Sequence, residues 1–154
     1  MPYLILIITL TLAGPLPRPQ ATNLTGHWVR VPSADTASAI DPFEAQSEDI
    51  VQTLLDVQIT QRWGIQVLTQ TRVFDGVERD DPNLPGGPAR STTAWQGDRL
   101  VTTLRRTVTL PAGVATVDVR EVRYLDGNRM VVEITWTSGT TTVNRRVSYA
   151  QVLQ

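Results

Sequence analysis

Turn-forming residues divide the second half of the chain at regular intervals, and this spacing constrains the fold more than any other feature. Turn signals at residues 96–98, 111–113, 126–128 and 138–139 separate five segments rich in Thr, Val, Ile and aromatic residues, the composition that β-strands favour. The signal at residues 126–128 is the strongest because Asp, Gly and Asn all tolerate positive φ. The second half therefore predicts consecutive antiparallel hairpins.

Side-chain alternation within these segments supports the strand prediction. One face of the segment 129–137 carries Met130, Val132, Ile134 and Trp136. In the last segment, residues 140–152, Arg145 and Tyr149 share a face with two valines. A period of two over four or more residues is typical of a half-buried strand.

The first half is less regular. Residues 25–31, 54–61 and 65–74 are expected as strands, and the Pro- and Gly-rich stretch 80–88 as a loop. The acidic link 32–53 is expected as a long loop, with a helical turn over residues 47–55 that Ser47 would cap. The count is eight strands, which predicts an all-β, eight-stranded antiparallel up-and-down barrel. An open sandwich is the alternative, but its Greek-key crossovers need longer links.

The N-terminal segment has the pattern of a targeting signal. An apolar run at residues 4–12 is followed by Gly and Pro residues, and Ala21 offers a small residue at which a peptidase can cut. The run is shorter than the roughly 20 apolar residues that span a bilayer. We expect a signal peptide at residues 1–21 and one barrel domain at residues 22–154, with no membrane span in the mature chain. An uncleaved anchor is the alternative.

Cysteine content and charge narrow the class of protein. The chain has no Cys, which excludes disulfides and thiolate metal sites, and an exported protein without disulfides suits a bacterial periplasmic or secreted location. The net charge of −1 combines an acidic stretch at residues 33–81 with an Arg-rich stretch from residue 90 onward. Neither stretch has the strongly basic character of a nucleic-acid binder. Cross-strand pairs between Arg and carboxylates on an outer sheet face account for both.

The head of the first expected strand carries a family motif. Gly26-His27-Trp28 resembles the Gly-x-Trp of lipocalins and their barrel relatives, the calycins. The resemblance implies a lipocalin-like barrel in which Gly26 and Trp28 form the base, with an Arg of the last strand stacked on the Trp ring. Arg145 or Arg146 would take that role. It also implies that residues 32–53 form a lid over the open mouth.

Three stretches extend the resemblance. Residues 24–28, 84–87 and 94–101 are similar to the "sGtW", "PGG" and "WdGdxLv" patterns of small exported bacterial lipocalin-like domains. This resemblance implies a fold and an envelope location, and it carries no assigned activity or cofactor. The chain departs from larger lipocalins because it lacks disulfide cysteines and a long helix after the barrel, so the ligands of those proteins do not carry over.

Few residues offer chemistry for an enzyme or a metal site. His27 is the single histidine, so no histidine cluster for a metal exists, and it should point outward because its neighbour Trp28 points inward. Glu121 and Glu133 on neighbouring strands are the one carboxylate pair that a barrel enzyme could use. Arg residues across the sheet are the more natural partners of these carboxylates. We expect neither an enzyme nor a cofactor or metal.

Binding of a small molecule inside the barrel is the favoured function. Arg145 and Tyr149 would lie in an apolar cup, where a ligand carboxylate could pair with the Arg. The cup would be lined by Trp136, Met130, Ile134 and Val132. The alternatives are a barrel packed solid with side chains, with Arg145 stacked on Trp28, and an interaction module that presents its Thr- and Arg-rich strands to another envelope protein.

Overall fold

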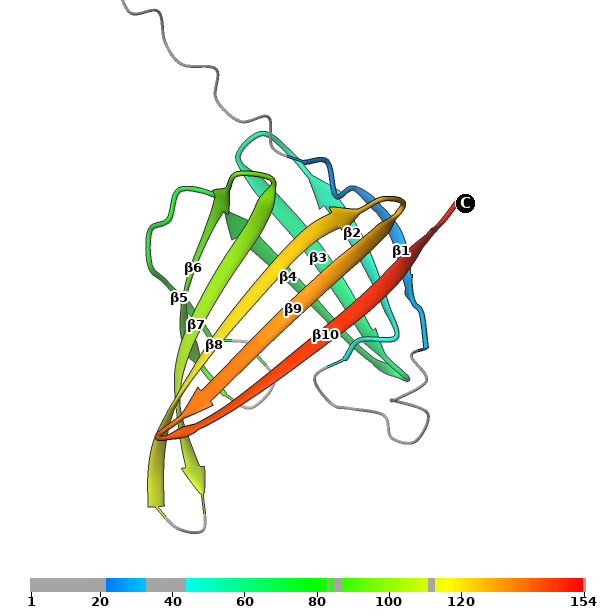
Figure 1. Cartoon of the computed structure of the whole chain (residues 1–154). Coiled ribbons are helices and arrows are strands. Elements are labelled where there is room, and N and C mark those ends of the chain that lie inside the picture. Colours follow the sequence, from blue (N-terminus) through cyan, green and yellow to red (C-terminus); the bar gives the residue numbers. More distant parts are fainter. Residues whose placement is uncertain (1–21, 33–43, 83, 85–86, 111–112, 154) are drawn as a thin grey trace, which may run out of the picture.

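The computed structural model describes residues 22–32, 44–82, 84, 87–110 and 113–153. Within these ranges the chain is all-β and contains no helix, and hence none long and apolar enough to cross a membrane. The strands form one antiparallel sheet that curls round an interior (Figure 1). The predicted signal peptide at residues 1–21 lies outside the described residues.

Ten strands make up the described part of the sheet. They are β1 (Gly26–Arg30), β2 (Ser47–Gln52), β3 (Asp56–Trp63), β4 (Gln66–Val73), β5 (Arg79–Asp81), β6 (Ala89–Gln96), β7 (Arg99–Leu110), β8 (Gly113–Asp126), β9 (Arg129–Ser138) and β10 (Thr141–Val152). Their order in the sheet is β4-β3-β2-β1-β10-β9-β8-β7-β6-β5. Every pair of neighbours is therefore consecutive in the chain except β1 and β10. This is the predicted up-and-down arrangement, and it rules out the sandwich.

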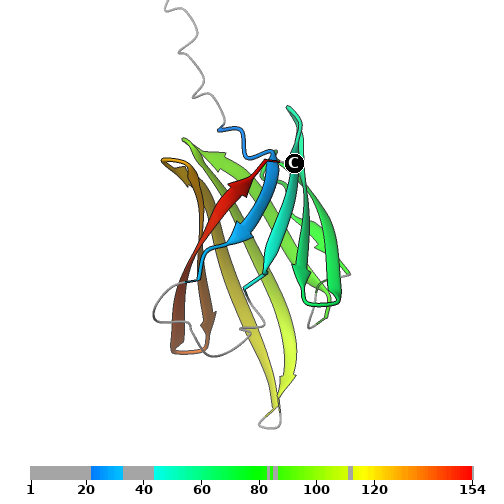
Figure 2. The same ribbon diagram turned by 90° about the vertical axis from the view of Figure 1, so that its right-hand side faces the viewer.

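The first and last strands pair with each other, as the barrel prediction requires. Trp28 lies opposite Gln151, and Arg30 lies opposite Tyr149. Figure 2 shows β1 and β10 side by side, with the rest of the sheet curving away on both sides of them. The pairing joins two hairpin sets, β1–β4 and β5–β10, into one curved sheet.

The barrel has a seam between β4 and β5, which are the two ends of the sheet. One isolated bridge, between Asp75 and Ala94, joins the two sides near the seam. Further along it, Arg72 Nη1 donates to Asp81 Oδ2 at 2.6 Å and to Ser91 Oγ at 2.9 Å. The fold is thus a ten-stranded half-barrel closed partly by side chains, and the expectation of complete backbone closure is wrong.

Two strands are absent from the sequence prediction, so the count of eight is wrong. Residues 47–52 form β2 and contain no helical turn, because Ser47 pairs with Val29 on one side and Arg62 on the other. β5 is a three-residue strand held against β6. The stretch available for the predicted lid is also shorter, because residues 47–52 of the range 32–53 form β2. Residues 33–43 lie outside the described residues.

The apolar core fills the end of the barrel where the β2–β3, β6–β7 and β8–β9 turns lie. Trp28 is buried there, and its Nε1 donates to the carbonyl of Leu24 at 2.9 Å. Around it pack Leu24, Ile50, Val57, Ile59, Leu100, Met130, Val132, Val147 and Tyr149. Gly26 and Trp28 therefore lie at this filled end, called the closed end below, and the role at the barrel base that the Gly-x-Trp resemblance implies for them stays a prediction.

The implied Arg on the Trp28 ring is wrong. Gln151 is the residue opposite Trp28, and Arg145 lies six positions before it, about 20 Å along a strand. Arg146 instead donates to Asp126 at 3.4 Å. The contact that holds the edge of the indole is the hydrogen bond from Nε1 to the carbonyl of Leu24.

Candidate functional site

The barrel interior contains a buried ion pair between strands far apart in the sequence. Arg123 of β8 and Glu48 of β2 are 2 % and 1 % exposed, and their side chains form a bidentate pair. Arg123 Nη2 lies 2.9 Å from Glu48 Oε1, and Nε lies 3.2 Å from Oε2. Gln61 Nε2 donates to Glu48 Oε1 at 2.7 Å. The strands bring together groups 75 residues apart.

Each nitrogen of the Arg123 guanidinium donates to a protein carboxylate. Its third nitrogen, Nη1, donates to Glu121 on the same strand. Buried charges are costly unless they are paired and hydrogen-bonded, and here every guanidinium nitrogen has a carboxylate partner. The ion pair is therefore complete without a bound ligand.

Tyr149 adds a polar group at the same depth. Its side chain is buried, and its hydroxyl donates to the carbonyl of Ala45 at 3.1 Å. Burial raises the pKa of the Tyr149 phenol well above its usual range, and the nearby carboxylate of Glu48 acts in the same direction. The phenol stays protonated and is already engaged by the backbone.

The six predicted ligand-binding residues share the interior face of β9 and β10. The register places Met130 opposite Tyr149 and Ile134 opposite Arg145. Exposure increases along the two strands from the closed end to the open end. Met130, Val132 and Tyr149 are buried, Ile134 and Trp136 are half-buried, and Arg145 is exposed. Arg145 and Tyr149 are four positions apart, about 13 Å along the strand, so they lie at different depths. Their contact with a ligand stays a prediction.

The open half of the interior carries apolar side chains that are only partly covered. Ile134 and Trp136 of β9 and Leu68 of β4 are half-buried. Leu68 lies opposite Gln61, whose side chain points to Glu48, so Leu68 shares the interior face. The side chains thus fill the barrel around Trp28 and leave apolar surface toward Trp136.

Sequence reasoning missed Glu48 and Arg123. On β8 the residues that look like core are Val122 and Tyr124, yet they lie on the outer face, where they form a small cluster with Val101 and Val131. The one available signal was local, namely that Arg123 alternates with these two apolar neighbours and so must occupy the opposite face. Only the register shows that this face is the interior.

The proposed carboxylate pair for an enzyme does not form. Glu121 lies opposite Ile134 on the interior face, whereas Glu133 lies opposite Val122 on the outer face. Glu133 accepts a hydrogen bond from the Tyr124 hydroxyl at 2.8 Å. The two carboxylates are on opposite sides of the sheet, so the pairing of Glu121 with Glu133 is wrong.

His27 lies on the outer face of β1, as predicted. Its Nδ1 is 2.5 Å from Asp49 Oδ1, and Arg62 Nη2 donates to Asp49 Oδ2 at 3.1 Å. The hydrogen bond with His27 is the main cause that lowers the pKa of Asp49, and Arg62 adds to the effect. The histidine belongs to a surface network of charged side chains.

The fold agrees with solved structures of calycin type. No family model and no curated protein matches the chain. The zebrafish ileal bile acid-binding protein complexed with cholic acid is similar over 83 % of this chain and 98 % of its own, with a TM-score of 0.59 and 18 % identity. Human cRBP IV aligns over 85 % and 99 % (TM-score 0.56, 12 % identity). The REP1-NXSQ fatty acid transporter aligns over 85 % and 97 % (TM-score 0.58, 14 % identity).

Because the sequence identities to these three structures are low, the similarity defines the fold of this chain and nothing more. The chain is an antiparallel β half-barrel of calycin-like fold, which confirms the all-β, up-and-down part of the fold that the Gly-x-Trp resemblance implied but not its eight strands.

Proposed function

We propose that this protein binds a small apolar or amphipathic molecule in the open half of the barrel interior. The observation that carries the proposal is the gradient along the interior face of β9, from buried Met130 to half-buried Ile134 and Trp136. Partly exposed apolar side chains on a concave face gain free energy when a ligand removes them from water. Two structural neighbours, a bile acid-binding protein and a fatty acid transporter, support a ligand of this class.

An anionic head group would lie beside Arg145, at the open end of the interior. Glu48 and Glu121 already occupy the three guanidinium nitrogens of Arg123, so a ligand carboxylate would have to displace them. Arg145 lies opposite Ile134 and is exposed at the open end. A ligand whose apolar part contacts Ile134 can therefore present a carboxylate to Arg145 from the solvent side.

The test combines native mass spectrometry with titration. Protein purified from its own host should carry a small molecule, and the recombinant domain should bind 1-anilinonaphthalene-8-sulfonate, cholate or oleate, followed by fluorescence. Ile134→Asp places a charge on the interior face and should abolish binding. Thr135→Asp, the next residue on the outer face, is the matched control and should bind as the wild type does. Equal binding by both folded variants, or no binding by the wild type, would refute the proposal.

We further propose that the domain acts outside the cytoplasm, after removal of residues 1–21. The support is the apolar run at residues 4–12, the small residue Ala21 and the absence of Cys. The intact mass of the protein from its host decides between this proposal and an uncleaved anchor. A mature chain should begin near Thr22.

An interaction module is the second candidate. The core around Trp28, Met130 and Tyr149 is tightly filled, and the outer faces carry many Thr and Arg residues, which suit a contact with another envelope protein. Native mass spectrometry of the protein purified from its own host also distinguishes these two functions. A ligand-free protein that co-purifies with one defined envelope protein would favour the module.

A further inference from the structure

The open half of the barrel interior ends on a layer of polar side chains. Arg123 of β8 and Glu48 of β2 reach across the interior, with Nη2 and Oε1 2.9 Å apart. Gln61 of β3 donates to the same carboxylate at 2.7 Å, and Glu121 accepts from Arg123 Nη1. Arg123 lies opposite Val132, and Ile134 follows on the same face of β9 toward the open end. These four polar side chains therefore form the floor of the open half.

Glu121 is the member of this floor that is turned toward the open end. It precedes Arg123 by two residues on the same face of β8, and the register places it opposite Ile134. Its side chain is 20 % exposed, whereas that of Glu48 is 1 % exposed. The contact with Arg123 uses one of the roughly four acceptor positions of a carboxylate. Glu121 can therefore accept a further hydrogen bond from a molecule that lies on Ile134.

The chemistry of the floor discriminates between possible inner ends of a ligand. Every guanidinium nitrogen of Arg123 already donates to Glu48 or Glu121, so a ligand carboxylate would have to displace one of them beside a like charge. A methyl end would cover Glu121 without a hydrogen bond, which is costly for a charged group. A hydroxyl group avoids both costs, because it donates its proton to the carboxylate.

We propose that Glu121 selects the ligand by accepting a hydrogen bond from a hydroxyl group at the end of the ligand that enters the barrel. This inference rests on the proposed function, because it concerns the same interior site. The ligand class is then an amphipathic molecule whose inner end carries a hydroxyl. Glu121 is a specificity-determining residue of that site, and Ile134 contacts the adjoining apolar part of the ligand.

The test compares three ligands that differ at one end only: decanoate, 10-hydroxydecanoate and decanedioate. Each displaces 1-anilinonaphthalene-8-sulfonate from the wild-type protein, and fluorescence gives the dissociation constants. We expect 10-hydroxydecanoate to bind about fivefold more tightly than decanoate, the order of one net hydrogen bond, and decanedioate to bind most weakly. Glu121→Leu removes the acceptor and should abolish the preference for the hydroxyl. Glu121→Gln keeps a carbonyl oxygen and should retain it.

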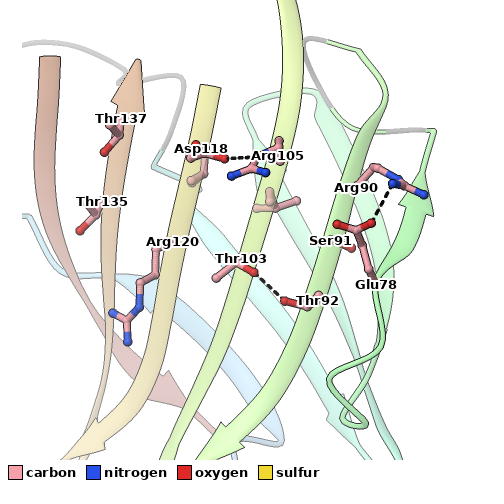
Figure 3. Close-up of a pocket in the computed structure, with 12 residues that line it drawn as sticks. Glu78, Arg90, Ser91, Thr92, Thr103, Arg105, Asp118, Arg120, Thr135 and Thr137 are labelled. Atoms are coloured by element: carbon pink, nitrogen blue, oxygen red, sulfur yellow. Dashed lines mark hydrogen bonds and ion pairs between the residues drawn. The ribbon is translucent and has the colours of Figure 1, made fainter. Parts of the chain in front are cut away.

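Asp118→Leu is the matched control on the outer face of the same strand. Asp118 lines a groove across β6 to β9, where Arg105 Nε lies 2.6 Å from its Oδ1 (Figure 3). Its replacement removes a carboxylate that is paired with an arginine, as Glu121→Leu does, but on the other side of the sheet. The control should therefore keep the fivefold preference.

The outcomes separate this inference from the proposed function. Wild-type protein that binds none of the three ligands would overturn the proposed function and this inference with it. Binding of decanoate or decanedioate as tight as that of 10-hydroxydecanoate would overturn this inference alone, and that comparison needs no variant to fold. Equal loss of the preference in Glu121→Leu and Asp118→Leu would overturn it as well.

Discussion

Replacement of Arg123 by Met tests whether the interior ion pair is buried as the structure describes. The substitution keeps an unbranched side chain of similar length and removes the charge, so Glu48 is left in the core with only Gln61 as a polar partner. Glu121 loses the same partner, but its side chain is 20 % exposed and can be hydrated. Glu48 therefore bears most of the cost.

The size of the effect follows from burial. Removal of one partner from a buried pair costs about 3–5 kcal/mol because the other charge remains without compensation. Replacement of both partners by apolar residues is often neutral, so Glu48→Met combined with Arg123→Met should recover most of the lost stability. Since a domain of this size is stable by roughly 5–15 kcal/mol, Arg123→Met should reduce the stability severely.

The assay is urea denaturation followed by circular dichroism. Arg105→Met is the matched control, because Arg105 makes a 2.6 Å contact with Asp118 while its side chain is 69 % exposed. Exposed pairs contribute little to stability, so this variant should unfold close to the wild type. If Arg123→Met does not fold, Glu48→Gln, which keeps an oxygen to accept from Gln61, should fold with reduced stability. Equal stability of Arg123→Met and Arg105→Met would refute the buried pair.

Three further predictions concern other parts of the barrel. Tyr149→Phe should cost about 1 kcal/mol at pH 7 through the lost hydrogen bond. Burial raises the pKa of Tyr149, so the unfolded chain ionises first as the pH rises. The free energy of unfolding of the wild type should therefore hold below about pH 10 and fall above it. Urea denaturation at pH 8 and pH 11 should show a smaller fall for Tyr149→Phe. His27→Phe removes the hydrogen bond that lowers the pKa of Asp49, so this pKa should rise toward its ordinary value. Carboxyl ¹³C NMR measures the change. On acidification, the stability that Asp49 contributes should then be lost at a higher pH than in the wild type. Gly26→Ala should cost about 1–2 kcal/mol in urea denaturation because its φ of +154° is strained for Ala. The added Cβ would also displace the flexible end of the Gln151 side chain, which adds little to this cost.

Local sequence patterns were sufficient for most of the strands. The predicted strand at residues 99–110 coincides with β7, and residues 129–137 differ from β9 by one residue. Turn chemistry and period-two alternation act over a few residues, so they are visible without the fold. The pairing of β1 with β10 also followed, because a meander that closes must join its first and last strands.

Alternation also identified which β9 residues share a face. It could not say which face of β8 is the interior, because Val122 and Tyr124 have the more apolar pattern and yet lie outside. The strand β2 was not predicted, because Glu48 interrupts the apolar face of that strand.

The sequence alone thus determined most of the strands, their up-and-down order and the residues that share a face, because these depend on interactions between near neighbours. Tertiary structure decided that Arg123 and Glu48 lie inside. A charged side chain is stable in the core only when its partner arrives from elsewhere in the chain, and here the partners are 75 residues apart. The contact of Arg72 with Asp81 and Ser91 across the seam between β4 and β5 likewise appears only in the tertiary structure.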